Sequence, residues 1–377
     1  MTKIIPAIIV SCFLLSCTTQ KKASTKSING LKFIGEYLLP DKTDFKNTRV
    51  GGLSSIDYNP GEKLYYFISD DRSDSAPARY YTARIFLSAK GIDSLRFADV
   101  VFLRQRNGSV YPNKNGDSLH VPDPEGLRIN RKSSELVWTN EGERIVRKDY
   151  VILQDPSVNI MRKDGQLLDT FFLPPNMHVT ATESGPRRNG TFEGLAFADG
   201  FETLYVSVEE PLYEDGLRAG VNDSTASIRF IKYNVQTKKP LAQYAYLLDP
   251  VVREPIPKGS FEINGVPDIL AVNDRQLLVT ERSFSNGYLT CNVRVFLVDT
   301  NDGEDVSNVT SLKASPQKNF LQKRLLLNMD KLGINIYNIE GATFGPRLPN
   351  GKQSLLFVAD DNFSGREKTQ LLLFEVE

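Results

Sequence analysis

The chain contains little cysteine, histidine and tryptophan, and it has no excess of charge of either sign. His120 and His178 are its only histidines, too few for a His-rich zinc or iron site. Cys12 and Cys17 lie near the N-terminus, which leaves Cys291 alone and excludes a disulfide in the remaining chain. The 46 basic and 46 acidic residues balance, and this balance argues against a nucleic-acid-binding protein.

The N-terminus has the pattern of a bacterial lipoprotein leader. Lys3 precedes an apolar stretch at 4–15 that is too short to span a bilayer comfortably. The sequence Leu-Leu-Ser-Cys at 14–17 matches a lipobox, so we expect a signal peptide at 1–16 and a lipid on Cys17. A polar tether at 17–29 would then join the membrane anchor to a body at 30–377. The predicted location is the cell envelope, at the outer membrane or the periplasmic face; the alternative is an ordinary signal peptide with an incidental cysteine.

A short sequence motif recurs along residues 30–377. Glu125-Gly126, Glu193-Gly194 and Glu340-Gly341 each open an apolar run, and a second apolar run ending in acid follows about ten residues later. Weaker copies begin at Gly51 and at Asp268. A spacing of roughly 70 residues indicates stacked or circularly arranged units.

The repeat predicts an all-β fold, a single β-propeller of four-stranded blades. No long stretch has convincing helical periodicity, and four consecutive antiparallel strands per copy make one blade. In the copy that starts at Glu125, we expect the third strand at 149–153. The count is five blades, or six if an insert at 210–227 or 299–317 hides further strands. The last copy lacks a fourth strand, which the segment 31–39 would supply to close the ring.

The geometry of a propeller blade indicates where the repeated acids would form a functional site. The first two strands of a blade are antiparallel, so the start of the first and the end of the second lie on one face. Glu125, Glu193, Asp268 and Glu340 should therefore converge at one mouth of the central channel, with Gly51 in the fifth place. A ring of acids that end the second strands should surround them: Asp70, Asp71, Glu141, Glu209, Glu210, Glu281, Asp360 and Asp361. Basic residues are interleaved with this ring: Arg72, Arg144 and Arg282.

Such a cluster needs compensation, because two carboxylates about 6 Å apart repel by roughly 2 to 3 kcal/mol. Ca²⁺, which takes six to eight oxygen ligands, is one solution, and the arginines are another. The candidate metal ligands are the four inner acids, and Glu193 and Glu125 are the candidate catalytic residues. The substrate-binding candidates are Arg72, Arg144, Arg282, Asp70, Asp71, Glu209, Glu281, Asp360 and Asp361. Alternatively, the Glu-Gly pairs are structural, with each Glu accepting backbone hydrogen bonds and each Gly allowing a close turn.

The chain resembles the phytase-like domain of secreted bacterial proteins, described as the esterase-like activity of phytase family. The resemblance covers about 30–377 and is carried by Gly51-Gly52-Leu53, Ser69-Asp70-Asp71-Arg72, Pro124-Glu125-Gly126-Leu127, Phe192-Glu193-Gly194-Leu195, Thr280-Glu281-Arg282 and Ile339-Glu340-Gly341-Ala342. It implies a β-propeller related in architecture to the alkaline phytases, which use Ca²⁺ to bind and hydrolyse phosphomonoesters.

Three functional hypotheses follow. The first is a Ca²⁺-dependent hydrolase of phosphate or other esters with its site at the channel mouth. The second is a non-catalytic propeller that binds a glycan, small molecule or protein partner at the same face. The third is a structural envelope lipoprotein. In each case the expected protein is a monomer attached to the membrane by its lipid, with no nucleic-acid partner.

Overall fold

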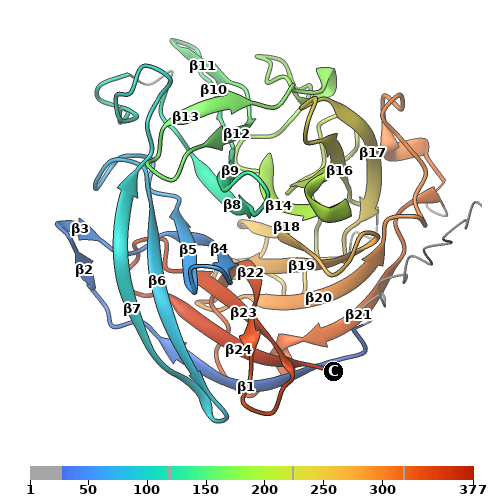
Figure 1. Cartoon of the computed structure of the whole chain (residues 1–377). Helices are drawn as coiled ribbons and strands as arrows, with labels where there is room; N and C mark the ends of the chain where they lie inside the picture. Colours follow the sequence, from blue (N-terminus) through green and yellow to red (C-terminus); the bar gives the residue numbers. More distant parts are fainter. Residues whose placement is uncertain (1–27, 118–119, 223–224, 317–318) are drawn as a thin grey trace, which may run out of the picture.

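A computed structural model describes residues 28–117, 120–222, 225–316 and 319–377. The predicted signal peptide, Cys17 and the tether up to residue 27 lie outside the described residues. Figure 1 shows a ring of strands around a central axis, with the short connections at its two faces. The all-β propeller predicted from the repeat is confirmed.

The ring has five four-stranded antiparallel sheets, which we number as blades in chain order. Blade 1 has β4 (Leu53–Asn59), β5 (Leu64–Ser69), β6 (Arg79–Ser88) and β7 (Gly91–Phe102). Blade 2 has β8 (Pro124–Asn130), β9 (Glu135–Asn140), β12 (Ser157–Met161) and β13 (Leu167–Thr170). Blade 3 has β14 (Phe192–Ala198), β15 (Thr203–Val208), β16 (Ser227–Asn234) and β17 (Pro240–Leu247). Blade 4 has β18 (Glu262–Ala271), β19 (Gln276–Ser285), β20 (Asn292–Asp299) and β21 (Lys323–Asn328).

Blade 5 joins the two ends of the described chain. Its strands are β22 (Asn338–Arg347), β23 (Gln353–Asp360), β24 (Gln370–Val376) and, as the outermost strand, β1 (Leu31–Leu38). The strand β1 pairs antiparallel with β24 from Leu31↔Val376 to Leu38↔Gln370, and Figure 1 shows blue β1 beside red β24. Ring closure by the N-terminal strand is therefore confirmed, and it removes one exposed edge of β24.

The third strand of blade 2 differs from the sequence prediction. The strand that pairs with β9 is β12, whereas 149–153 falls in a separate hairpin of β10 (Glu143–Val146) and β11 (Val151–Gln154). This hairpin leaves Val146 and Val151 exposed. The apolar run at 149–153 imitates a blade strand, and sequence alone could not distinguish it from the true one.

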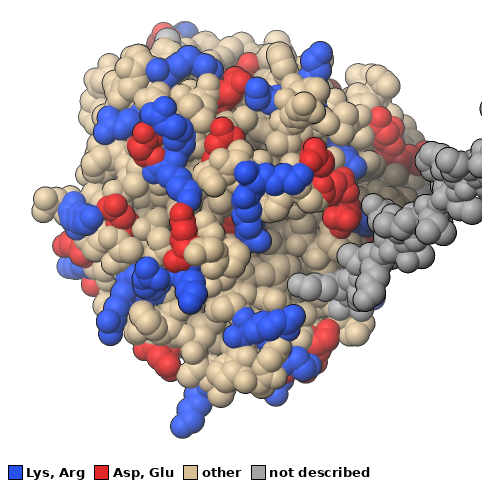
Figure 2. Space-filling model, in the orientation of Figure 1, with Lys and Arg blue, Asp and Glu red and all other residues tan. Residues whose placement is uncertain are grey.

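The remaining elements are small. A two-stranded sheet pairs β2 (Asp44–Phe45) with β3 (Thr48–Arg49). The short 3₁₀ helices are η1 (Pro175–Met177), η2 (Asp199–Phe201), η3 (Leu312–Ala314) and η5 (Met329–Lys331). Within the described ranges, no helix has the length and hydrophobicity needed to cross a membrane. On the face seen in Figure 2, basic and acidic side chains are interspersed.

The core lies between the blades, so the inner strands are buried on both faces. All six residues of β15 are buried, which explains why these strands read as continuous apolar runs. One cluster joins Val137 and Ile160 of blade 2 to Leu195 and Val206 of blade 3. Each blade therefore packs on its neighbours, and burial of apolar side chains holds the ring together.

The repeated glycines allow the inner strands to approach each other closely. A Cβ on Gly194 would lie 2.5 Å from the Cα of Asp268 and 2.6 Å from the backbone nitrogen of Ile269 in the next blade. A Cβ on Gly341 would lie 2.8 Å from the Cα of Ser55. These positions exclude a side chain because backbone from the adjacent blade occupies the space.

We expect Gly194→Ala to lower the free energy of unfolding by about 1 to 3 kcal/mol, since the added methyl forces two blades apart. Urea unfolding measures this difference. Gly365→Ala is the matched control, because a Cβ there meets nothing within 4 Å, and we expect a change within about 0.5 kcal/mol. Equal stability of the two variants would contradict the close approach.

Candidate active site at the acidic mouth

The strand register shows which residues are equivalent in the five blades. Each inner strand has a buried residue paired with one on the second strand: Ile56↔Phe67, Leu127↔Trp138, Leu195↔Val206, Ile269↔Val279 and Ala342↔Phe357. Two residues before the first member of each pair stand Ser54, Glu125, Glu193, Pro267 and Glu340. Three residues after the second member stand Asp70, Glu141, Glu209, Arg282 and Asp360. These ten positions lie at one end of the channel, which we call the acidic mouth.

This register corrects two of the equivalences inferred from the repeat. The fifth inner position is Ser54 rather than Gly51. The blade 4 equivalent of Glu193 is Pro267, so Asp268 takes the place of the repeated glycine, one residue further along. Asp268 accepts hydrogen bonds from Arg128 Nη2 at 2.8 Å and from the backbone N–H of Ala342 at 2.7 Å. Asp268 therefore belongs to a buried ion pair rather than to the inner group of acids.

The acids of the mouth form a closed electrostatic ring. Besides burial, the charge on one carboxylate raises the pKa of the next between Asp70 and Glu125, Glu125 and Glu193, and Glu193 and Glu340. Glu340 acts in the same way on Asp70, which closes the ring. The three repeated glutamates are thus brought together as predicted.

Burial and mutual repulsion favour the protonated form of these carboxyls. Burial is the main cause that raises the pKa of Glu340 to about 8, and the Asp360 charge adds to it while Arg282 opposes it. Burial, together with the neighbouring acids, also raises the pKa values of Asp70, Glu125, Glu141, Glu193 and Asp360 well above their ordinary values. Glu340 is therefore mostly protonated at neutral pH, and the pKa values of the other acids are shifted in the same direction.

One arginine lies within the ring of acids. Arg282 occupies the second-strand position that is acidic in the other four blades, and its Nη2 donates to Glu209 Oε1 at 2.6 Å. The same nitrogen lies 3.9 Å from Glu340 Oε1, and Nη1 donates to Asn338 Oδ1 at 2.8 Å. Arg282 thus neutralises one side of the mouth and makes it asymmetric.

Three residues at the rim were missing from the sequence prediction. Burial raises the pKa of Asp123 to about 7, although its ion pair with Arg72 at 3.3 Å opposes this shift. Glu143 accepts from Arg72 at 3.0 Å and from Arg188 at 2.7 Å. Asp123 stands only two residues before Glu125, a signal that could have found it. Glu143 and Arg188 have no counterpart in the repeat.

Two groups of carboxylates could hold a metal ion. One oxygen each from Asp123, Glu125 and Glu141 lie within 4.8 Å of one another, and the same is true of Glu141, Glu193 and Glu209. Glu141 belongs to both groups. Carboxylate oxygens at such separations match the ligand chemistry of a hard divalent cation.

Orphaned acceptor atoms lie on two other acids of the ring, outside the two groups. Asp70 Oδ1 and Asp360 Oδ2 are buried and have no hydrogen-bond partner among the described residues. The Asp360 residue is 0 % exposed. An unpartnered buried carboxylate oxygen is costly, and a cation or a donor from a bound molecule would satisfy it. The carboxylate oxygens of the two groups fit a divalent cation.

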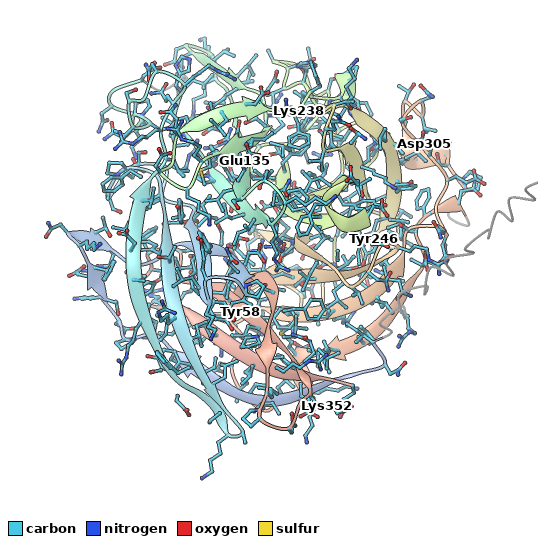
Figure 3. All side chains as sticks on the ribbon, in the orientation of Figure 1. Tyr58, Glu135, Lys238, Tyr246, Asp305 and Lys352 are labelled. Atoms are coloured by element: carbon cyan, nitrogen blue, oxygen red, sulfur yellow. The ribbon has the colours of Figure 1, made fainter. Side chains whose placement is uncertain are left out.

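Other predicted site residues have structural partners instead. Glu281 accepts from Tyr246 Oη at 2.6 Å, Asn264 Nδ2 at 2.7 Å and Lys323 Nζ at 2.5 Å, between blades 3 and 4. Figure 3 labels Tyr246 in this region. The three hydrogen-bond partners of Glu281 show that this residue holds blades 3 and 4 together, away from the acidic mouth.

The remaining predicted residues form ion pairs and hydrogen bonds in the loops around the mouth. Asp71 pairs with buried Arg79 at 2.7 Å, and Asp361 accepts the Gly52 N–H at 2.9 Å. Arg144 donates to the carbonyl oxygens of Thr180 and Thr182, whereas Glu210 pairs with Arg218 at 2.6 Å. Asp71, Asp361 and Arg144 therefore order the rim.

The geometry defines a five-bladed β-propeller with a carboxylate-lined mouth. The chain belongs to the phytase-like family described as "Esterase-like activity of phytase", whose model matches residues 48–363. No curated protein matches the sequence.

Solved structures with a similar course of the chain have low sequence identity to this protein and low TM-scores. An endo-arabinase from Bacteroides thetaiotaomicron has 12 % identity and a TM-score of 0.42, with 87 % of this chain and 95 % of that chain covered. A xylan β-1,4-xylosidase from Bacillus halodurans has 11 % identity and a TM-score of 0.43, with coverages of 91 % and 53 %. A protein of unknown function from Dyadobacter fermentans has 9 % identity and a TM-score of 0.37, with coverages of 93 % and 100 %. None of them assigns a substrate to this chain.

We expect the metal-free protein to lose stability as the pH rises. The pKa of Glu340 rises from an ordinary 4.5 to about 8 in the folded chain, so between these values the folded state binds more protons than the unfolded state. Each such group lowers the free energy of unfolding by at most about 1.4 kcal/mol per pH unit in this window. Urea unfolding in a chelator across the window measures the slope.

Glu340→Gln should reduce the dependence of the free energy of unfolding on pH, because a neutral amide replaces a carboxyl that must otherwise ionise. Glu135→Gln, at the opposite end of blade 2, should leave it unchanged. A stability that rises through this pH window in both the wild-type chain and Glu340→Gln would contradict the raised pKa.

Proposed function

We propose that the chain is a Ca²⁺-dependent hydrolase that acts on an ester at the acidic mouth. The observation that carries the proposal is the pair of carboxylate triads that share Glu141. The family description, esterase-like activity of phytase, supports a hydrolytic reaction. Oxygen-only candidate ligands favour calcium over the softer transition metals.

Cations would be held by two groups that share Glu141: Asp123, Glu125 and Glu141, and Glu141, Glu193 and Glu209. A bound divalent cation supplies polarisation of an ester oxygen and a lower pKa for a coordinated water. Glu125 and Glu193 lie next to each other in the ring of acids, and burial raises the pKa of both carboxyls well above the ordinary value. A raised carboxyl pKa suits groups that release and accept protons. We assign to these two residues the proton transfers of the reaction.

The arginines would orient an anionic substrate. Arg282 and Arg72 lie on different sides of the mouth, and each already binds a carboxylate with one or two of its N–H groups. A guanidinium offers further donors in a planar fork that matches phosphate or carboxylate. A substrate with an anionic group beside the scissile ester is therefore our preferred class.

The cellular setting is part of the proposal. A lipid on Cys17 would attach the protein to the bacterial cell envelope, at the outer membrane or the periplasmic face. The propeller would act there as a monomer on a small-molecule ester. Its formal net charge of zero supports the absence of a nucleic-acid partner.

Calcium should stabilise the folded chain and support turnover. At a hundredfold excess over its dissociation constant, a ligand that binds only the folded form adds about 2.7 kcal/mol, which raises the thermal midpoint by several degrees. Glu193→Gln should abolish both the calcium shift and hydrolysis of a chromogenic phosphate or carboxylate ester. Glu135→Gln should retain both.

Three outcomes separate the hypotheses. A calcium shift with ester turnover supports the hydrolase. A calcium shift without turnover on either ester class would favour the non-catalytic binding propeller. No shift at millimolar calcium near neutral pH, with wild-type stability in Glu193→Gln, would overturn the metal site.

A further inference from the structure

A cavity lies at the other end of the channel. The larger of the two cavities described here has a volume of about 690 Å³, and the far ends of the inner strands line it. We call it the basal cavity. Its lining includes Asp57, Arg128, Phe197, Leu270, Phe344 and Lys352, and none of the acids of the mouth contributes to it. Its volume falls in the usual range for small-molecule sites.

A buried polar network separates the basal cavity from the acidic mouth. Arg128 of blade 2 donates to Ser55 Oγ at 3.1 Å, to the Ile56 carbonyl at 3.0 Å and to Asp268 at 2.8 Å. Its side chain is 4 % exposed. Because the network joins blades 1, 2 and 4 across the channel, a ligand in the cavity would not reach the mouth.

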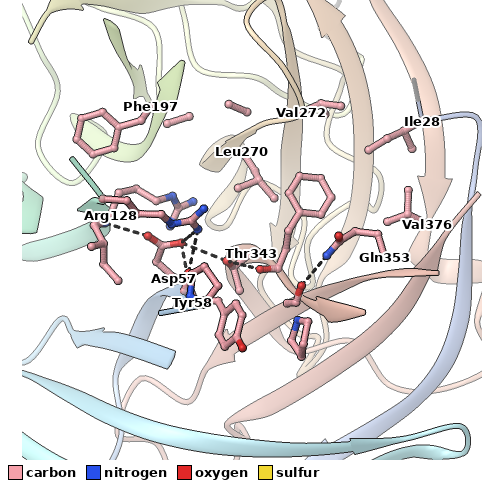
Figure 4. A pocket seen from close by; sticks show the side chains of 18 of the residues that line it. Ile28, Asp57, Tyr58, Arg128, Phe197, Leu270, Val272, Thr343, Gln353 and Val376 are labelled. Carbon is pink, nitrogen blue, oxygen red and sulfur yellow. Dashed lines mark hydrogen bonds and ion pairs between the residues drawn. The ribbon is translucent and has the colours of Figure 1, made fainter. Parts of the chain in front are cut away.

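The walls of the basal cavity are largely apolar. Figure 4 shows Arg128 and Asp57 on one side of the cavity and Ile28 and Val376 on the other. Leu270, Val272 and Phe344 also line it. Such walls suit a hydrocarbon chain or ring, because burial of apolar surface is the main favourable term in binding.

The rim of the cavity carries more cations than acids. Arg131, Arg347 and Lys352 contribute positive charges, whereas Glu377 is the acid at the end of the chain. Arg347 donates to a backbone carbonyl, which leaves its charge in place. Arg131 donates to the Tyr58 carbonyl and also lies 4.0 Å from Asp57 Oδ1, so Arg347 and Lys352 are the stronger candidates for an anion. The cavity's buried acid, Asp57, already accepts the Ile129 N–H at 2.9 Å and the Thr343 hydroxyl at 3.2 Å.

We propose that the basal cavity binds a small amphipathic anion, an apolar chain or ring that carries one carboxylate. The apolar body would lie against Leu270, Val272 and Phe344. The carboxylate would lie at the rim near Arg131, Arg347 and Lys352. This site is independent of the proposed hydrolase activity, since it uses different residues at the opposite mouth.

Calorimetric titration of the full-length chain with octanoate, 1-octanol and acetate tests the proposal. We expect octanoate to bind at one site per chain, 1-octanol to bind several-fold more weakly, and acetate to give no binding. Lys352→Gln and Arg347→Gln should each weaken octanoate about two- to fivefold, the size of one exposed ion pair, and should leave 1-octanol unchanged.

Cavity-filling variants locate the site. Ala271 lines the basal cavity, so Ala271→Phe should abolish octanoate binding. Ala242 lines the other described cavity, of about 430 Å³, so Ala242→Phe should leave octanoate binding unchanged. The thermal midpoint of both variants reports whether the propeller remains folded. Failure of octanoate to bind at millimolar concentration, equal binding of 1-octanol, or unchanged octanoate binding in a folded Ala271→Phe would each overturn the proposal.

Discussion

Mutual repulsion among buried carboxylates is the constraint on which the acidic mouth depends. The propeller places the same two positions of every blade around one axis, so an acid repeated in sequence becomes an acid ring in space. Apolar packing between the blades holds that ring in place, and the glycines beside the glutamates let the inner strands approach. The fold therefore forces charges together that would separate in a more flexible chain.

The structure offsets this repulsion in two ways. Arg282 replaces one acid of the ring and pairs with Glu209, while Arg72 and Arg188 pair with acids at the rim. Burial raises the pKa values of the remaining carboxyls, that of Glu340 to about 8, which favours their protonated form. A mouth that is partly neutralised and partly protonated is suited to exchange protons for a divalent cation.

The sequence predicted the five blades, ring closure by β1 and the convergence of Glu125, Glu193 and Glu340, because these depend on a repeat with a constant period. It failed where the repeat is broken. Pro267 occupies the position of the repeated glutamate, so the alignment of Asp268 with Glu193 was one residue out of place. Glu281 was selected by its position after an apolar strand, but the side chain faces blade 3. The ion pair of Arg128 with Asp268 joins residues 140 apart in the chain, and no local pattern predicts it.

Proton release on calcium binding tests the central claim most directly. Calorimetric titration near neutral pH, in two buffers with different heats of ionisation, gives the number of protons released per bound calcium. If the acids of the mouth are protonated until a cation replaces those protons, calcium should release about one proton or more per ion. Calcium binding without proton release would contradict this account of the mouth, as would the absence of calcium binding.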